Sequence, residues 1–97
     1  MRYEIVFAPE AVEDLRRLKA NVRAEVRSGI ESHLRNEPKK TSRSRIKRLR
    51  GITRPQYRLR IGDVRVFYDV SASAVEILAV VAKSEAESWV TQFASRA

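Results

Sequence analysis

Hydrophobic residues recur at two spacings along this chain, and the spacing separates expected strands from expected helices. Residues 3 to 7 alternate, with Tyr3, Ile5 and Phe7 on one side of an extended segment and Glu4 and Val6 on the other. Successive side chains of a strand point to opposite faces, so this period of two predicts a short strand with one buried face.

Two amphipathic helices are expected next, joined by a very short turn. Pro9 suits the first turn of a helix, and the first helix should run to about Lys19. Asn21 is a good N-cap for the second helix, which should end near Asn36 because Pro38 disfavours helical geometry just before it. The two buried stripes consist of Val12, Leu15 and Leu18, and then of Val22, Val26, Ile30 and Leu34.

Three further strands and a last helix complete the pattern. The strands are expected at about Gln56 to Ile61, Val64 to Val70 and Val75 to Ala82, which are rich in β-branched and aromatic residues. Ser84 and Glu87 form a capping-box pattern for the final helix. Its apolar stripe contains Ala86, Trp89, Val90 and Phe93, so Trp89 is expected to pack in the core or in a partner's groove. The order β-α-α-β-β-β-α predicts an α+β fold in one domain, residues 1–97, with the helical hairpin packed on a mainly antiparallel sheet.

The second and third of these strands read as a hairpin with arginines on one face. If Gly62 and Asp63 form a two-residue turn, Arg60 lies opposite Arg65 and Arg58 lies opposite a phenylalanine. Alternation then assigns two faces. The core face holds Tyr57, Leu59, Ile61, Val64, Val66, Tyr68 and Val70, and the other face holds Arg58, Arg60, Arg65, Phe67 and Asp69.

Opposed arginines on a strand pair are unfavourable unless an anion lies between them. Like charges directly opposite each other cost up to roughly 1 kcal/mol. Guanidinium groups bind phosphate through charge-assisted hydrogen bonds, and Phe67 beside them offers a ring on which a nucleobase can stack. The alternative is that the arginines extend into water and Asp69 neutralises one of them.

The charge balance points to the same kind of ligand. Twenty Lys and Arg against twelve Asp and Glu give a net charge of +8, and residues 39 to 60 contain ten of those cations and no acid. Such a segment attracts polyanions, so Lys47, Arg48 and Arg50 are expected to contact RNA, with an acidic protein as the other partner it would suit. The alternative is a solvated basic loop that only aids solubility.

Several classes of protein are excluded or made improbable by composition. The absence of cysteine rules out disulfides and cysteine zinc sites, and the longest apolar run, residues 77–82, is too short to cross a bilayer. We therefore expect a cytoplasmic protein without a membrane, metal or cofactor site. A two-histidine ribonuclease pair is impossible because His33 is the only histidine; near a helix C-terminus its charged form should be favoured. The carboxylates of Glu10, Glu13, Asp14 and Glu25 are expected to be solvated helix faces.

The run "LRGITRPQYRLRIGDVRVFYDV", with the apolar strand and short helix after it, resembles the RelE/ParE toxin superfamily over essentially the whole chain. The resemblance implies a microbial-ribonuclease-like fold and a toxin silenced by an antitoxin from the neighbouring gene. RelE-type members cut mRNA in the ribosomal A site by attack of the ribose 2′-hydroxyl on the adjacent phosphate, without a metal. Operator DNA would be reached only through the antitoxin.

The resemblance also assigns roles to residues. Arg58 and Arg60 match the basic pair on the strand after "LRG", Arg65 matches an arginine that contacts the scissile phosphate, and Lys83 matches a basic residue that closes the last strand. Arg65, Lys83 and Arg60 are thus the expected catalytic residues. Two positions depart from the pattern: Ser84 stands where an arginine is frequent, and Val90 stands at the best match to a catalytic tyrosine. These departures keep two alternatives open, a ParE-type gyrase inhibitor and a catalytically degenerate RNA-binding member that acts only in an antitoxin complex.

Overall fold

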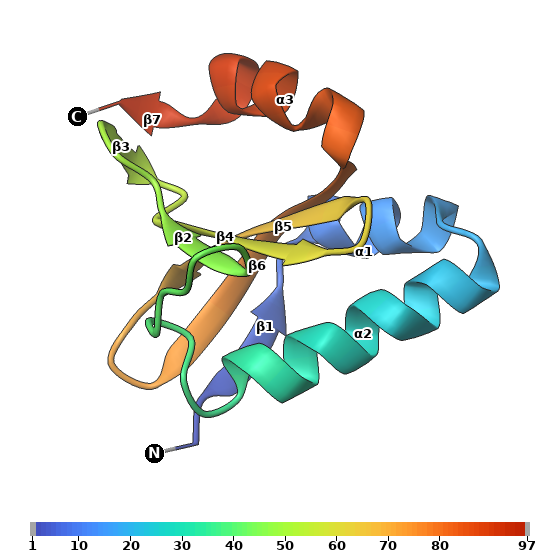
Figure 1. Ribbon diagram of the computed structural model, residues 1–97, viewed down its shortest axis with the longest axis horizontal. Helices are drawn as coiled ribbons and strands as arrows, with labels where there is room; N and C mark the ends of the chain where they lie inside the picture. Colours follow the sequence, from blue (N-terminus) through green and yellow to red (C-terminus); the bar gives the residue numbers. More distant parts are fainter. Residues whose placement is uncertain (1, 97) are drawn as a thin grey trace.

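A computed structural model describes residues 2–96 of the chain (Figure 1). Two sheets are present. Five strands form the larger one in the order β1-β6-β5-β4-β2, and β3 pairs with β7 in a small ribbon. The elements are β1 (Glu4–Phe7), α1 (Pro9–Arg17), α2 (Ala20–Leu34), β2 (Ile46–Arg48), β3 (Ile52–Arg54), β4 (Tyr57–Ile61), β5 (Val64–Val70), β6 (Ala74–Ala82), a 3₁₀ turn (Lys83–Glu85), α3 (Ala86–Phe93) and β7 (Ser95–Arg96).

The predicted order β-α-α-β-β-β-α is confirmed as the framework of an α+β fold. The sheet is antiparallel except where β1 pairs in parallel with β6, in a register that places Ile5 opposite Val75. Three short strands were not predicted. β2 and β3 lie in the basic segment, and β7 follows α3; β2 extends the sheet beyond β4, with Ile46 opposite Leu59.

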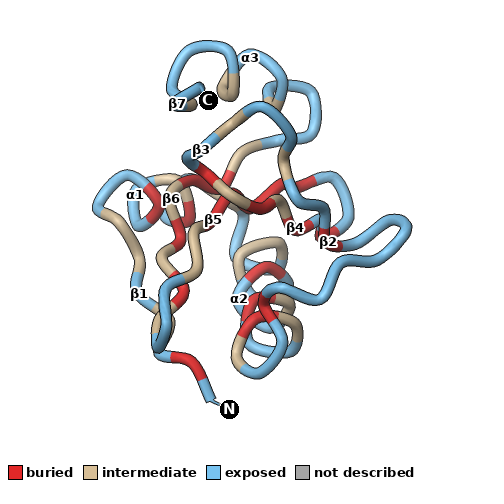
Figure 2. Tube along the Cα trace, turned by 90° about the vertical axis from the view of Figure 1, so that its left-hand side faces the viewer, coloured by how far each residue is buried: buried red, intermediate tan, exposed pale blue. Residues whose placement is uncertain are grey.

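The hydrophobic core lies between the sheet and the helical pair, as expected. Leu15 of α1 and Val26, Ile30 and Leu34 of α2 pack in one buried cluster with the core face of β4, β5 and β6. All seven predicted residues of the hairpin's core face belong to or pack against this cluster. Figure 2 shows the buried segments concentrated in the sheet and on the inner side of α2, while α3 lies across the opposite face of the sheet.

The free edge of β6 beyond β1 is covered by α1. The carboxylate of Asp14 accepts a hydrogen bond from the backbone N–H of Val80 at 2.9 Å. An unpaired strand edge is a template for unwanted pairing, and a side-chain acceptor removes one such donor. The expectation that Asp14 is merely a solvated residue is therefore wrong.

Three local predictions about the helices are also wrong. The N-cap of α2 is Lys19, so Asn21 lies inside the first turn. No side chain caps α3, because the 3₁₀ turn at Lys83–Glu85 leads directly into it and removes the extended N-cap that a capping box requires. Val12 is 39% exposed, since α1 buries Ala11 and Leu15 instead, at a spacing of four.

Candidate functional site

The hairpin of β4 and β5 has the predicted register. Arg60 pairs with Arg65 and Arg58 pairs with Phe67 across the two strands. Gly62 opens the two-residue turn with a φ of 56°, a left-handed conformation that glycine adopts without the penalty that a Cβ atom adds. The turn therefore fixes the register that brings the arginines together.

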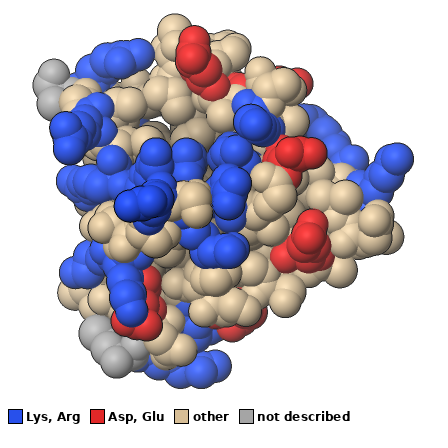
Figure 3. Space-filling model, viewed as in Figure 1, with Lys and Arg blue, Asp and Glu red and all other residues tan. Residues whose placement is uncertain are grey.

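Cations from three adjacent strands share the face of the sheet opposite α2. We call this set the arginine face: Lys47 of β2, Arg58 and Arg60 of β4, and Arg65 of β5. In the sheet, Lys47 lies opposite Arg58, and Arg60 lies opposite Arg65. Figure 3 shows lysine and arginine side chains gathered over the region of β2 and β4, with few carboxylates among them.

Arg65 lies close against the turn of its own hairpin. It is only 8% exposed, and its Nη1 atom donates hydrogen bonds to the carbonyl oxygens of Gly62 at 2.9 Å and Val64 at 3.1 Å. These bonds hold the guanidinium in one orientation. Within residues 2–96, the donors on Nε and Nη2 of Arg65 make no hydrogen bond, so they remain for a ligand.

Arg58 lies half-buried at the centre of the arginine face and is incompletely paired. Its Nη2 atom donates to the carbonyl oxygen of Ser44 at 3.3 Å, but its Nε is buried with no hydrogen-bond partner among the described residues. Burial lowers the pKa of Arg58, and the nearby charges of Arg65 and Arg60 lower it further. A buried donor without a partner is uncommon in folded proteins. An anion on the arginine face would offset the repulsion among these cations, and it would reach Nε of Arg58 once that side chain turned outward.

Phe67 does not offer a stacking surface, so this prediction is wrong. Its side chain is 1% exposed because Trp89 of α3 stacks on it, with ring centroids 4.7 Å apart and planes 10° apart. The ring centroid of Trp89 also lies 5.7 Å from that of Phe93. The predicted role of Trp89 in packing is borne out, whereas a nucleobase has no access to the ring of Phe67.

The remaining predicted cations lie around the arginine face rather than on it. Lys83 is exposed, and its backbone N–H donates to the carbonyl oxygen of Asp63 at 2.7 Å, which places it beside the hairpin turn. Arg48 lies over the ring of Tyr57, 5.1 Å from its centroid, on the opposite side of the sheet from Lys47. Arg50 is exposed in the turn between β2 and β3.

None of the chain's tyrosines lies on the arginine face. Tyr3, Tyr57 and Tyr68 belong to the core on the helical side of the sheet. The hydroxyl of Tyr68 donates to the carbonyl oxygen of Pro38 at 2.7 Å, and burial raises its pKa far above the ordinary value. Tyr68 is therefore unsuited to acid–base chemistry near neutral pH.

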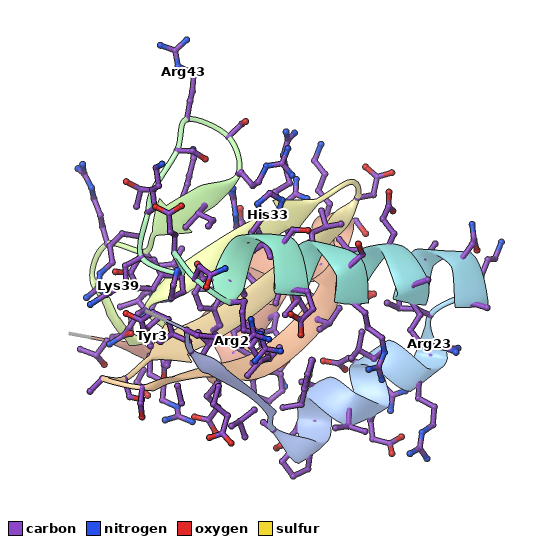
Figure 4. All side chains as sticks on the ribbon, turned by 90° about the horizontal axis from the view of Figure 1, so that it is seen from below. Arg2, Tyr3, Arg23, His33, Lys39 and Arg43 are labelled. Atoms are coloured by element: carbon purple, nitrogen blue, oxygen red, sulfur yellow. The ribbon has the colours of Figure 1, made fainter. Side chains whose placement is uncertain are left out.

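His33 is also distant from the arginine face. Figure 4 views the molecule from the side of α2 and shows His33 on that helix. Burial lowers the pKa of His33, and the charge of Arg45 lowers it further. The expectation that the charged form of His33 is favoured is therefore wrong, because desolvation and a neighbouring cation both disfavour the charged imidazole.

Residues 2–96 contain no group of three or more His, Cys, Asp or Glu side chains placed to hold a metal ion. No helix within the same range is long and apolar enough to cross a membrane.

Comparison with solved structures identifies related folds. The RelBE2 toxin–antitoxin complex from Mycobacterium tuberculosis is 26% identical, with a TM-score of 0.70 over 84% of this chain and 92% of that chain. The RelB–RelE complex from Methanococcus jannaschii is 20% identical, with a TM-score of 0.64 over 87% of this chain and 96% of that chain. The RelE–RelB complex from Pyrococcus horikoshii OT3 is 21% identical, with a TM-score of 0.60 over 86% of this chain and 97% of that chain. The two archaeal matches show a shared fold.

Comparison with sequence families identifies the chain itself. No curated protein sequence matches it. A family model, described as ParE toxin of type II toxin-antitoxin system, parDE, matches residues 5–87. Because that match spans most of the sequence and the fold agrees with the RelE structures, the chain belongs to the ParE toxin family of type II toxin–antitoxin systems, within the RelE/ParE superfamily.

Proposed function

We propose that this toxin is an endoribonuclease that cleaves mRNA on the ribosome. The observation that carries the proposal is the clustering of Arg58 with the opposed pair Arg60 and Arg65 on one sheet face, where burial and the charges of Arg65 and Arg60 lower the pKa of Arg58. A phosphodiester in the RNA backbone supplies negative charge and hydrogen-bond acceptors to such a cluster. The arginine face would thus serve as the phosphate site of this toxin.

Arg58 and Arg65 would bind the non-bridging oxygens of the scissile phosphate. The donors of Arg65 that its own hairpin leaves free are held by the sheet before the substrate arrives, whereas the guanidinium of Arg58 would have to turn toward the phosphate to use its buried Nε. The 2′-oxygen then attacks phosphorus, and the bond from phosphorus to the 5′-oxygen breaks. The products are a 2′,3′-cyclic phosphate and a free 5′-hydroxyl. Fixed guanidinium groups stabilise the extra charge of the transition state without further reorganisation.

Two proton transfers accompany this step. A group of the ribosome would accept the proton of the attacking 2′-hydroxyl, and Lys83, exposed beside the hairpin turn, or a second ribosomal group would deliver a proton to the leaving 5′-oxygen. With a poorly placed acid or base, the enzyme would forfeit about 10²- to 10⁴-fold in rate. Arg60 is exposed next to Arg65 and would bind a flanking phosphate.

The partners follow from the same surfaces. The exposed cations Lys47 and Arg50 would contact ribosomal RNA at the A site in the cytoplasm, and Arg48 would do so from the other side of β2. The solved relatives are complexes with antitoxins, and a cognate antitoxin would silence this toxin too. Binding to operator DNA would occur only through that antitoxin.

Primer extension in a reconstituted translation reaction tests the proposal. Wild-type toxin should produce mRNA ends only when ribosomes are present. Arg60→Ala should lower cleavage by about tenfold or more, whereas Arg27→Ala, which removes an exposed charge from α2, should retain it. Intact mRNA with the wild-type toxin, or equal cleavage by both variants, would refute the assignment.

One observation favours a different target. Among residues 2–96, neither the histidine nor any tyrosine reaches the arginine face, so neither can act there as a general acid or base. A toxin that inhibits its target through protein contacts requires no such group. The second candidate is therefore inhibition of DNA gyrase. Supercoiling by purified gyrase in the presence of the toxin distinguishes the two, because a ribonuclease leaves this reaction unchanged.

A further inference from the structure

A groove of about 660 Å³ lies between α1, β6 and α3, on the same side of the sheet as the arginine face but toward the β6 edge, where Val81 pairs with Arg65. Its apolar lining comprises Leu78, Val81, Trp89 and Phe93. Phe93 is 60% exposed, and α3 contains no buried residue. An exposed large aromatic side chain beside other apolar groups is typical of an interaction site rather than of a free surface.

Acidic residues surround this apolar floor in a protein that is otherwise strongly basic. Four of the chain's twelve acidic residues line the groove: Glu10, Glu13, Asp14 and Glu85. Arg17 and Arg54 line it as well, so the lining has four acidic and two basic residues and a net formal charge of −2. Arg54 is paired with Asp69 at 3.5 Å and Glu76 at 3.2 Å, and Glu13 is paired with the exposed Arg16 at 3.5 Å. By formal charge the groove is negative, while the molecule as a whole carries +8.

The charge of the groove selects the class of its occupant. RNA is repelled by carboxylates and is attracted instead to the arginine face. A protein segment with apolar side chains and neighbouring lysines or arginines matches both parts of the lining. The solved relatives were each crystallised with an antitoxin chain, which makes the antitoxin the protein partner at hand.

We propose that the groove between α1, β6 and α3 binds an apolar, positively charged segment of the cognate antitoxin. This segment is distinct from any acidic part of the antitoxin that covers the arginine face. The proposal rests on the antitoxin partner named under Proposed function and is independent of the ribonuclease reaction. It predicts that the antitoxin carries opposite charges in two segments, one matched to the groove and the other to the arginine face.

Charge reversal in the groove tests this pairing. The probe is the purified antitoxin encoded beside the toxin, titrated calorimetrically into each full-length variant at about 0.15 M salt. Glu10→Lys with Glu13→Lys should raise the dissociation constant about tenfold or more. Glu25→Lys with Glu87→Lys changes the net charge equally at exposed positions outside the groove and should stay within about twofold. Equal effects of the two pairs, or none, would overturn the proposal.

The apolar floor is tested by a second matched pair. Phe93→Ser should weaken antitoxin binding about tenfold, since an exposed aromatic side chain becomes a buried anchor in the complex. Val12→Ser removes an apolar side chain that is 39% exposed outside the groove and should leave the dissociation constant within about twofold. Circular dichroism should confirm that all variants remain folded, since every altered side chain is exposed.

Photo-crosslinking identifies the occupant directly. With benzoylphenylalanine in place of Phe93, mass spectrometry of the crosslinked complex should locate an antitoxin segment with net positive charge. A crosslink to an acidic segment, or to a second copy of the toxin, would contradict the proposal. Translation arrest by each free variant is measured in parallel. Absence of translation arrest with the wild-type toxin would refute only the proposed ribonuclease activity. The binding data would still decide whether the groove binds the antitoxin.

Discussion

Arg58→Met should make the toxin more stable and less active. Methionine keeps an unbranched apolar stem of similar length but removes the buried Nε, which has no partner in the free protein. An unsatisfied buried donor costs about 1–3 kcal/mol. The variant loses the hydrogen bond to Ser44, which at 3.3 Å and an exposed position contributes roughly 0.5 kcal/mol. It also loses the repulsion from Arg60 and Arg65, so a net gain of about 1 kcal/mol is expected.

Thermal unfolding in a buffer without phosphate measures this gain. For a domain of this size, about 1 kcal/mol corresponds to a rise in Tm of about 4–8 °C. Arg60→Met is the matched control, because it removes the same charge from an exposed position of the same strand and should change stability by about 0.5 kcal/mol or less. Added phosphate should raise the Tm of the wild type more than that of Arg58→Met. An unchanged or lower Tm for Arg58→Met would show that Nε is satisfied in the free protein, and equal shifts with phosphate for both proteins would show that Arg58 does not bind the anion.

Three other measurements probe the scaffold. Gly29→Ala should raise the free energy of unfolding, measured in urea, by less than the gain of about 1 kcal/mol expected from helix propensity, because its Cβ would lie 2.6 Å from Cδ1 of Ile61. Ile61→Val removes that Cδ1 and should restore the gain in the double variant. Additive effects of the two substitutions would contradict the clash. Tyr68→Phe should cost about 1–2 kcal/mol in the same assay, because the carbonyl of Pro38 loses its buried donor. The pKa of His33 is lowered by folding, so the unfolded chain binds more protons and stability falls as pH drops below the ordinary value of 6.5. His33→Gln should flatten this decline in Tm, and an unchanged pH profile would mean that folding leaves the pKa of His33 unaltered.

The hairpin could be predicted in detail because its determinants are local. A two-residue turn at Gly62 sets the register, and a slip by one residue would turn Leu59 and Val66 toward the solvent face. The pairing of Arg60 with Arg65 follows from the same register. Long helices with regular apolar stripes, such as α2, were predictable for a similar reason.

The errors concern contacts between elements that are far apart in sequence. Phe67 has the position of an exposed residue in the alternation, but Trp89 covers it from α3, and no local pattern indicates where a helix will lie. β2 has a single buried residue, Ile46, so its strand character comes from pairing with β4 rather than from its own sequence. The groove was not predictable either, because it is formed by three separate elements.

The parallel pairing of β1 with β6 has a consequence for protein synthesis. Glu4 pairs with Ala74, so β1 leaves the ribosome well before β6 and has no partner until β6 has been made. The β4–β5 hairpin can form earlier because its contacts are local, but parallel pairing requires closure of a long loop. A message that is truncated before β6 is therefore expected to yield a chain whose sheet lacks both β6 and its pairing with β1. The topology thus makes the complete five-stranded sheet, including the strands that carry the arginine face, depend on translation through β6.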